Sequence, residues 1–109
     1  MARLRVSVAA RRDITKALRF SDQRWGPAQR QAYRALVEEA LLDLLENPEH
    51  PASRPRDEIR PGVRTFHIAR RGRPGRHLIV YRLGPDGAVE VMRLLHDAMD
   101  LTRAFSTSP

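Results

Sequence analysis

Apolar side chains recur at the spacing of one helical face between residues 33 and 45. The series consists of Tyr33, Leu36, Val37, Ala40, Leu41, Leu44 and Leu45, and acidic residues lie between its members. Pro27 fits the first turn of such a helix because its missing N–H needs no partner there, and Asn47 before Pro48 ends it. The pattern predicts an amphipathic helix that packs its leucine-rich face on a second layer of the protein.

The residues before this helix predict a strand and another helix. Residues 4–8 alternate apolar and polar side chains, with Val8 as the last apolar member, which is typical of a short strand. The period then becomes helical, and a second apolar stripe consists of Ala10, Ile14, Ala17, Leu18 and Trp25. Gly26 is a helix stop, and Pro27 begins the next helix at once. The two helices should therefore form an antiparallel hairpin, with Trp25 closing its end.

Three strand patterns follow a proline-rich loop at residues 48–62. They cover residues 63–69, 78–83 and 88–95, and the last two are joined through Asp86 and Gly87, a strong hairpin signal. A helical turn or two is expected in the tail, residues 96–109. The order β-α-α-β-β-β predicts an α+β fold, a single domain over residues 1–109. Its N-terminal strand and helical hairpin pack on a small, mainly antiparallel sheet, and the other sheet face stays partly open.

Charge narrows the choice of partner. The net charge is +7, and all but one of the 20 lysines and arginines are arginines, Lys16 being the exception. This balance favours an anionic partner, either nucleic acid or an acidic protein segment. Chains encoded by GC-rich genomes show the same balance, so the positions of the arginines indicate more than their number. Four arginines, Arg70, Arg71, Arg73 and Arg76, lie between the first and second of the three predicted strands. This segment is either an arm that contacts nucleic acid or a solvated loop.

Composition also excludes several classes of site. The chain has no cysteine, which rules out disulfides and cysteine-based metal sites. The four histidines, His50, His67, His77 and His96, lack the spacing of a metal-ligand pair, so no metal or cofactor is expected. No signal peptide and no run of about 20 apolar residues is present, and a cytoplasmic protein that does not contact membranes is expected.

Four motifs in order resemble a known family. They are Trp25-Gly26 between the helices, residues 59–64 entering a strand, residues 76–82 in the next strand, and residues 93–96 followed by Met99 and Asp100. Together they resemble the RelE/ParE superfamily of toxins from bacterial type II toxin–antitoxin systems, and within it the ParE branch, over residues 4–102. The resemblance implies a toxin that inhibits DNA gyrase by binding it. It also implies a ParD-like antitoxin that neutralises the toxin. We expect this antitoxin to have an acidic C-terminal segment.

The binding interpretation assigns two sets of residues and no catalytic residue. The target-binding set is Arg93, His96, Met99 and Asp100, at and beyond the last strand. The antitoxin-binding set is Trp25, Tyr33, Arg64 and Arg82.

Two alternatives stay open. RelE-like relatives cut messenger RNA on the ribosome, and such a nuclease would use His96 as general acid and Arg64, Arg82 and Arg93 as a phosphate clamp. A catalytic site of this kind should place several of the four on one open face, whereas a binding module need not. The other alternative is an inactive member of the superfamily that only binds its antitoxin. Tyr81 is expected to belong to the core, with its hydroxyl bonded to a neighbour.

Overall fold

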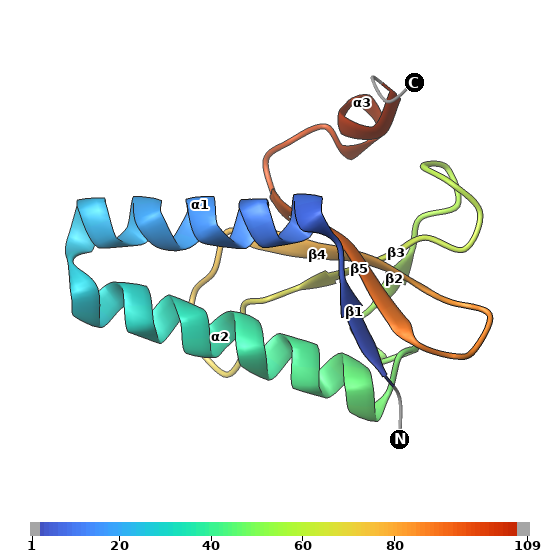
Figure 1. The fold of residues 1–109 in the computed structure, drawn as a ribbon, viewed down its shortest axis with the longest axis horizontal. Coiled ribbons are helices and arrows are strands. Elements are labelled where there is room, and N and C mark those ends of the chain that lie inside the picture. Colours follow the sequence, from blue (N-terminus) through green and yellow to red (C-terminus); the bar gives the residue numbers. More distant parts are fainter. Residues whose placement is uncertain (1–2, 107–109) are drawn as a thin grey trace.

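Two long helices lie side by side on one side of a five-stranded sheet, and a short third helix lies apart from them (Figure 1). The computed structural model describes residues 3–106. In chain order the elements are β1 (Leu4–Val6), α1 (Val8–Trp25), α2 (Pro27–Glu46), β2 (Arg54–Pro55), β3 (Arg64–His67), β4 (His77–Leu83), β5 (Val89–His96) and α3 (Leu101–Ser106). This arrangement confirms the predicted α+β fold and its order of elements. No helix among residues 3–106 is long and apolar enough to cross a membrane.

The sheet order is β1-β5-β4-β3-β2. The strands β2 to β5 form antiparallel pairs, whereas β1 pairs in parallel with β5, with Leu4 opposite Val89. The sequence did not predict the parallel pair or the two-residue strand β2, which lies within the expected loop. Both features depend on pairing between distant segments, and β2 is too short to show a period of its own.

The boundary between β1 and α1 corrects the expected strand. Val8 is not a strand residue but the first residue of α1, and its side chain is exposed. Ser7 explains the early start, because its hydroxyl accepts a hydrogen bond from the Ala10 N–H (2.9 Å) and so caps the helix. The same hydroxyl donates to the Met92 carbonyl oxygen (2.7 Å), which fixes the start of α1 against β5.

The turn between the helices forms as predicted, but Trp25 does not pack inside it. Gly26 takes a φ of 93°, which favours glycine, and its N–H donates to the Asp22 carbonyl oxygen (2.7 Å). Pro27 is the first residue of α2. Trp25 is 63% exposed, so the prediction that it closes the hairpin end is wrong. The tip of the helical hairpin extends beyond the strands (Figure 1), which leaves Trp25 without a layer to pack on.

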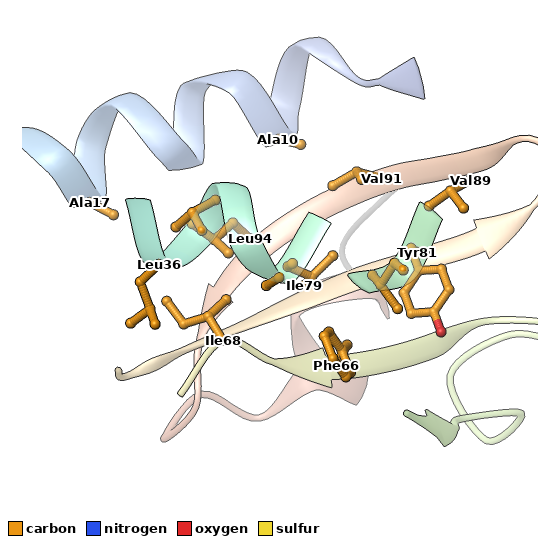
Figure 2. Packing of buried hydrophobic residues seen from close by; sticks show 13 residues of the cluster. Ala10, Ala17, Leu36, Phe66, Ile68, Ile79, Tyr81, Val89, Val91 and Leu94 are labelled. Atoms are coloured by element: carbon orange, nitrogen blue, oxygen red, sulfur yellow. The ribbon is translucent and has the colours of Figure 1, made fainter. Parts of the chain in front are cut away.

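The main core lies between the helical hairpin and the sheet (Figure 2). From α1 and α2 it takes Ala10, Ala17, Leu36, Val37, Ala40 and Leu44, and from the strands and the hairpin after β3 it takes Phe66, Ile68, Ile79, Tyr81, Val89, Val91 and Leu94. Each large side chain buried here contributes about 1.5–3 kcal/mol. The predicted stripe of α2 is confirmed, since Tyr33, Leu41 and Leu45 also pack against this cluster.

A second, smaller core lies on the opposite face of the sheet. It consists of Val63, Val80, Leu95 and Leu101, with Ile59, Leu78, Met92 and Ala104 packed around it. Leu101 and Ala104 belong to α3, so the predicted helical tail covers part of the face that the hairpin leaves open.

Candidate functional site

A groove of about 870 Å³ separates the helical hairpin from the end of β5 and from the loop between β3 and β4. The side chains that line it include Phe20, Ser21, Trp25, Tyr33, Arg93, His96 and Met99. Two of the predicted antitoxin contacts and three of the predicted target contacts therefore line one groove.

Exposed apolar side chains mark the mouth of this groove. Phe20 and Trp25 are 62% and 63% exposed, and their rings meet edge to face with centroids 6.3 Å apart. The Arg24 guanidinium lies 5.5 Å from the centre of the Trp25 ring, and Met99 is also exposed. Large exposed aromatic and methionine side chains are enriched at protein interfaces. The arrangement is suited to holding the apolar side of a protein segment.

Tyr33 and His77 form the polar floor of the groove. The Tyr33 hydroxyl lies 2.5 Å from His77 Nδ1 and accepts a hydrogen bond from the Arg76 N–H (3.0 Å). Burial lowers the pKa of His77 and raises the pKa of Tyr33. Both shifts favour the neutral forms, so the contact joins a neutral tyrosine to an unprotonated His77, and the tautomer of the imidazole decides which group donates. The tyrosine thereby ties α2 to the beginning of β4.

His96 stands at the rim, beside a cluster centred on Asp97. Its ring lies 5.6 Å from the His77 ring, and its Nδ1 accepts a hydrogen bond from the Ala98 N–H (3.1 Å). Asp97 contacts His67 Nε2 (3.0 Å) and Arg76 Nε (3.5 Å). The hydrogen bond from His67 lowers the pKa of Asp97. This rim is thus held by backbone and ion-pair contacts, while the His96 side chain remains about half exposed.

Arg93 is engaged in the structure of the groove wall. Its Nε and Nη2 donate to the two carboxylate oxygens of Asp13 (2.7 and 3.1 Å). The pair joins β5 to α1 and raises the pKa of Arg93. Asp100, the fourth predicted target contact, does not line the groove; it precedes α3, and its carboxylate accepts a hydrogen bond from the Arg103 N–H (3.2 Å) in the first turn of that helix.

The basic loop at residues 70–76 is folded back on α2 and does not extend as an arm. Arg70 forms an ion pair with Asp43, and Arg73 forms one with Glu39. The loop also packs closely, because a Cβ built on Gly75 would lie 2.8 Å from Ile68 Cγ1. The two arginines therefore hold the loop that forms one wall of the groove.

The other two predicted antitoxin contacts lie outside the groove. Arg64 Nε donates to the Ser53 hydroxyl (2.9 Å), which lies 2.5 Å from the Tyr81 hydroxyl. Tyr81 is fully buried and donates to the Pro48 carbonyl oxygen (2.5 Å), which confirms it as a core residue. Arg64 thus fixes the loop after α2. Arg82 Nε donates to Glu90 (2.8 Å).

The four residues of the nuclease alternative do not form a common site. Arg64 is opposite Tyr81, on the sheet face that carries the helical hairpin, whereas Arg82 and Glu90 lie on the other face. His96 is six residues along β5 from Glu90, about 20 Å at ~3.3 Å per residue. Arg93 and His96 both line the groove, but Arg64 and Arg82 lie too far along the strands from His96 to surround the same phosphodiester. Among residues 3–106, no group of three or more metal-ligating side chains could hold a metal ion.

Sequence reasoning missed Phe20, Ser21 and His77. Phe20 carried a usable signal, since a large apolar side chain away from the core stripe of a helix suggests a contact surface. Ser21 is 4% exposed and, among the described residues, its hydroxyl has no hydrogen-bond partner. His77 acquires its role only through the pairing of β4 and β5, which brings it opposite His96.

Solved structures and curated relatives resemble this chain over nearly its whole length. The chromosomal ParDE toxin–antitoxin system of P. aeruginosa contains a chain with a TM-score of 0.73 and 20% identity, covering 88% of this chain and 96% of that one. The toxin–antitoxin complex RelBE2 of Mycobacterium tuberculosis contains one with a TM-score of 0.57 and 26% identity, covering 87% and 96%. The fold is thus one found in proteins of toxin–antitoxin systems.

Sequence comparison identifies the family. Residues 4–101 match the family model of the ParE toxin of the type II toxin–antitoxin system parDE. Toxin ParE1 of M. tuberculosis H37Rv is 31% identical, with 94% of this chain and 96% of the relative covered. Toxin ParE1 of Caulobacter vibrioides is 33% identical, with 88% and 90% covered. The chain belongs to the ParE toxin family of type II toxin–antitoxin systems, which confirms the resemblance seen in the sequence.

Proposed function

We propose that this toxin acts in the cytoplasm by binding DNA gyrase, without cleaving a substrate, and that a ParD-like antitoxin neutralises it. The observation that carries the proposal is the shared groove. Trp25 and Tyr33, assigned to antitoxin binding, line it together with Arg93, His96 and Met99, assigned to target binding. A segment lying in the groove would cover the candidate contacts with the target.

The groove favours an amphipathic, acidic antitoxin segment. Phe20, Trp25 and Met99 offer apolar anchors, while Lys16 and Arg76 supply positive charge along the same groove. The net charge of +7 favours association with a negatively charged chain. The solved structures with this fold are described as a ParDE system and a RelBE2 toxin–antitoxin complex, which supports a partner of this kind.

The geometry favours binding over catalysis as the toxic activity. Arg64 and Arg82 lie on opposite faces of the sheet, and Glu90, the partner of Arg82, is about 20 Å from His96 along β5 at ~3.3 Å per residue. Binding to gyrase needs an accessible surface, and the exposed rim of the groove with His96 and Met99 provides one. The RelE-like endonuclease and the inactive member therefore serve as the alternatives that the experiment must separate.

The purified protein is tested for inhibition of gyrase and for cleavage of ribosome-bound message. Its gene is also expressed in cells, with and without the antitoxin gene. We expect inhibition of DNA supercoiling by purified gyrase, filamentous cells with a DNA-damage response, and relief of both by the product of the neighbouring antitoxin gene. Cleavage of ribosome-bound message would establish the endonuclease instead. Normal growth at confirmed soluble expression, with antitoxin binding retained, would establish the inactive member.

A further inference from the structure

A second hollow, of about 530 Å³, lies on the side of the sheet where α3 packs. Four arginines line it, namely Arg5, Arg60, Arg82 and Arg93, and Glu90 is the only carboxylate among its described lining residues. The arginines come from β1, from the loop before β3, from β4 and from β5. Segments far apart in the sequence thus bring positive charge to one place.

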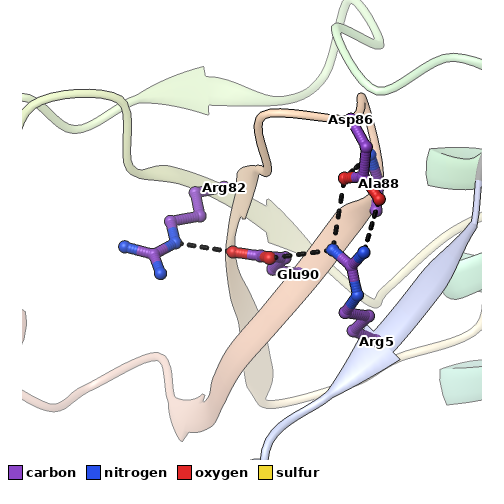
Figure 3. Close-up of polar contacts among 5 residues, drawn as sticks. All are labelled: Arg5, Arg82, Asp86, Ala88 and Glu90. Atoms are coloured by element: carbon purple, nitrogen blue, oxygen red, sulfur yellow. Dashed lines mark hydrogen bonds and ion pairs between the residues drawn. The ribbon is translucent and has the colours of Figure 1, made fainter.

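Two of the arginines at this hollow, Arg5 and Arg82, are oriented by carboxylates. Glu90 accepts hydrogen bonds from Arg82 Nε (2.8 Å) and from Arg5 Nη1 (3.0 Å), and Arg5 also pairs with Asp86 (Figure 3). The hydrogen bond from Arg82 lowers the pKa of Glu90, and the one from Arg5 lowers the pKa of Asp86 to about 2. Both carboxylates are therefore ionised at neutral pH and keep the guanidinium groups oriented.

Several donors remain available at these oriented groups. Arg82 uses only Nε, and its two Nη groups bond to no other described residue, while its side chain is 54% exposed. In Figure 3 the Nη end of Arg82 points away from Glu90 and Arg5. Arg93 uses Nε and Nη2 for Asp13, which leaves Nη1. Oriented guanidinium forks with available N–H groups bind tetrahedral oxyanions well.

The side chains around the hollow distinguish a phosphate ligand from a protein partner. None of the exposed large apolar side chains of the described residues, namely Leu4, Val8, Phe20, Trp25, Leu42, Leu83 and Met99, lines this hollow. A protein partner is usually anchored by such side chains, whereas a phosphate needs only N–H donors and charge. The apolar groove and the arginine hollow therefore differ in the ligand that each can hold.

We propose that the arginine hollow binds a phosphate of a nucleic-acid backbone, with Arg82 as the main contact. Arg82 lies outside the groove, and Arg93 is the one described residue that lines both the groove and the hollow. The contact would give the toxin an affinity for nucleic acid of its own, without base recognition, because guanidinium contacts to phosphate carry no sequence information. The shared chemistry is the phosphodiester, and either DNA or RNA could supply it.

The experiment measures binding of the full-length protein to a fluorescein-labelled DNA duplex and to a single-stranded RNA of equal length, by anisotropy over a range of salt concentrations. Arg82→Gln should weaken binding by roughly tenfold, as expected for one charge-assisted contact. It should also reduce the slope of log K against log salt concentration by about 1. Arg60→Gln, from the loop before β3, should act in the same direction.

Arg34→Gln is the matched control, because Arg34 is exposed on α2 outside the hollow and the change in net charge is the same. It should leave the affinity within about twofold and the slope unchanged, since its loss removes no phosphate contact. Tighter binding of the DNA or of the RNA identifies the source of the phosphate. Equal effects of Arg82→Gln and Arg34→Gln would mean that net charge alone attracts nucleic acid, and would overturn the site. A protein that binds neither the DNA nor the RNA would also overturn the site. Neither of these results bears on antitoxin or gyrase binding, which separate experiments measure.

Discussion

Asp13 on α1 accepts two hydrogen bonds from the Arg93 guanidinium of β5 and a third from the Leu94 N–H (3.0 Å). The Asp13 side chain is only 14% exposed. Water can therefore replace few of these hydrogen bonds if one partner is removed. The pair fixes the distance between the helical hairpin and the last strand. It therefore sets the width of the groove in which the candidate contacts lie.

Asp13→Asn should lower the free energy of unfolding by about 2 kcal/mol, because it removes the counter-charge of a partly buried Arg93 and disrupts hydrogen bonds to a charged group. Urea denaturation followed by circular dichroism measures the change. Asp22→Asn is the control, since Asp22 pairs with Arg30 at the surface (3.3 Å) and its loss should cost at most about 1 kcal/mol. A similar loss of unfolding free energy in the two variants would show that the Asp13–Arg93 pair stabilises the fold no more than a surface ion pair does.

Gly75→Ala should destabilise the loop that forms one wall of the groove. The added Cβ would lie 2.8 Å from Ile68 Cγ1 and 3.2 Å from Leu36 Cδ2, and both of these residues are buried. Overpacking of this kind costs about 1–3 kcal/mol. The same denaturation measurement applies. Gly72→Asn is the comparison, because Gly72 has open space around its Cα at a φ of 75° that asparagine tolerates, and it should cost less than about 1 kcal/mol.

The parts of this fold that the sequence predicted are those determined by neighbouring residues. The stripe of α2 follows from spacings of three and four, and the β4–β5 hairpin follows from Asp86 and Gly87, where Gly87 adopts a φ of 79°. Local signals of this type act within a few residues, and no distant segment has to be known. They were sufficient to place the helical hairpin on a sheet, because its leucine face had to be covered.

The site was harder to predict because its contacts join segments far apart in the chain. Arg70 and Asp43 each look like an ordinary surface charge until the β3–β4 loop folds onto α2. The exposure of Trp25 depends on how far the strands extend under the helical hairpin, which no pattern within α1 reports. Both predicted sets contribute residues to one groove. Trp25 and Tyr33 line it together with Arg93, His96 and Met99, whereas Arg64, Arg82 and Asp100 do not.

Trp25→Ala should separate partner binding from folding. Its side chain is largely exposed, so the free energy of unfolding should change by less than about 0.5 kcal/mol. As an aromatic anchor of the groove it should account for about 2 kcal/mol or more of antitoxin binding, which is a loss of roughly 30-fold or more in affinity. Calorimetry with the cognate antitoxin gives the affinity.

Leu42→Ala is the control for this variant. Leu42 is similarly exposed but lies on α2 outside the groove, so its removal should change the antitoxin affinity less than about threefold. Equal weakening by the two variants, or none by Trp25→Ala, would mean that the antitoxin does not use this groove.

Stability should fall as the pH decreases through the range in which the unfolded His77 gains a proton. Burial, followed by the nearby His96, lowers the pKa of His77 in the folded protein, while Asp97 and Asp13 act in the opposite direction. Below the ordinary value of about 6.5, the unfolded chain therefore binds more protons at this position than the folded chain does. The free energy of unfolding then rises with pH, and the stabilisation is fully present only above that value.

Urea denaturation between pH 5.5 and 7.5, an interval chosen to span about 6.5, measures this dependence for the wild type and for His77→Gln. The variant removes the titrating group but keeps a hydrogen-bonding partner for the Tyr33 hydroxyl, so its curve should be flatter by at most about 1.4 kcal/mol per pH unit. Parallel curves for the wild type and His77→Gln would show that burial in the groove floor does not keep His77 neutral.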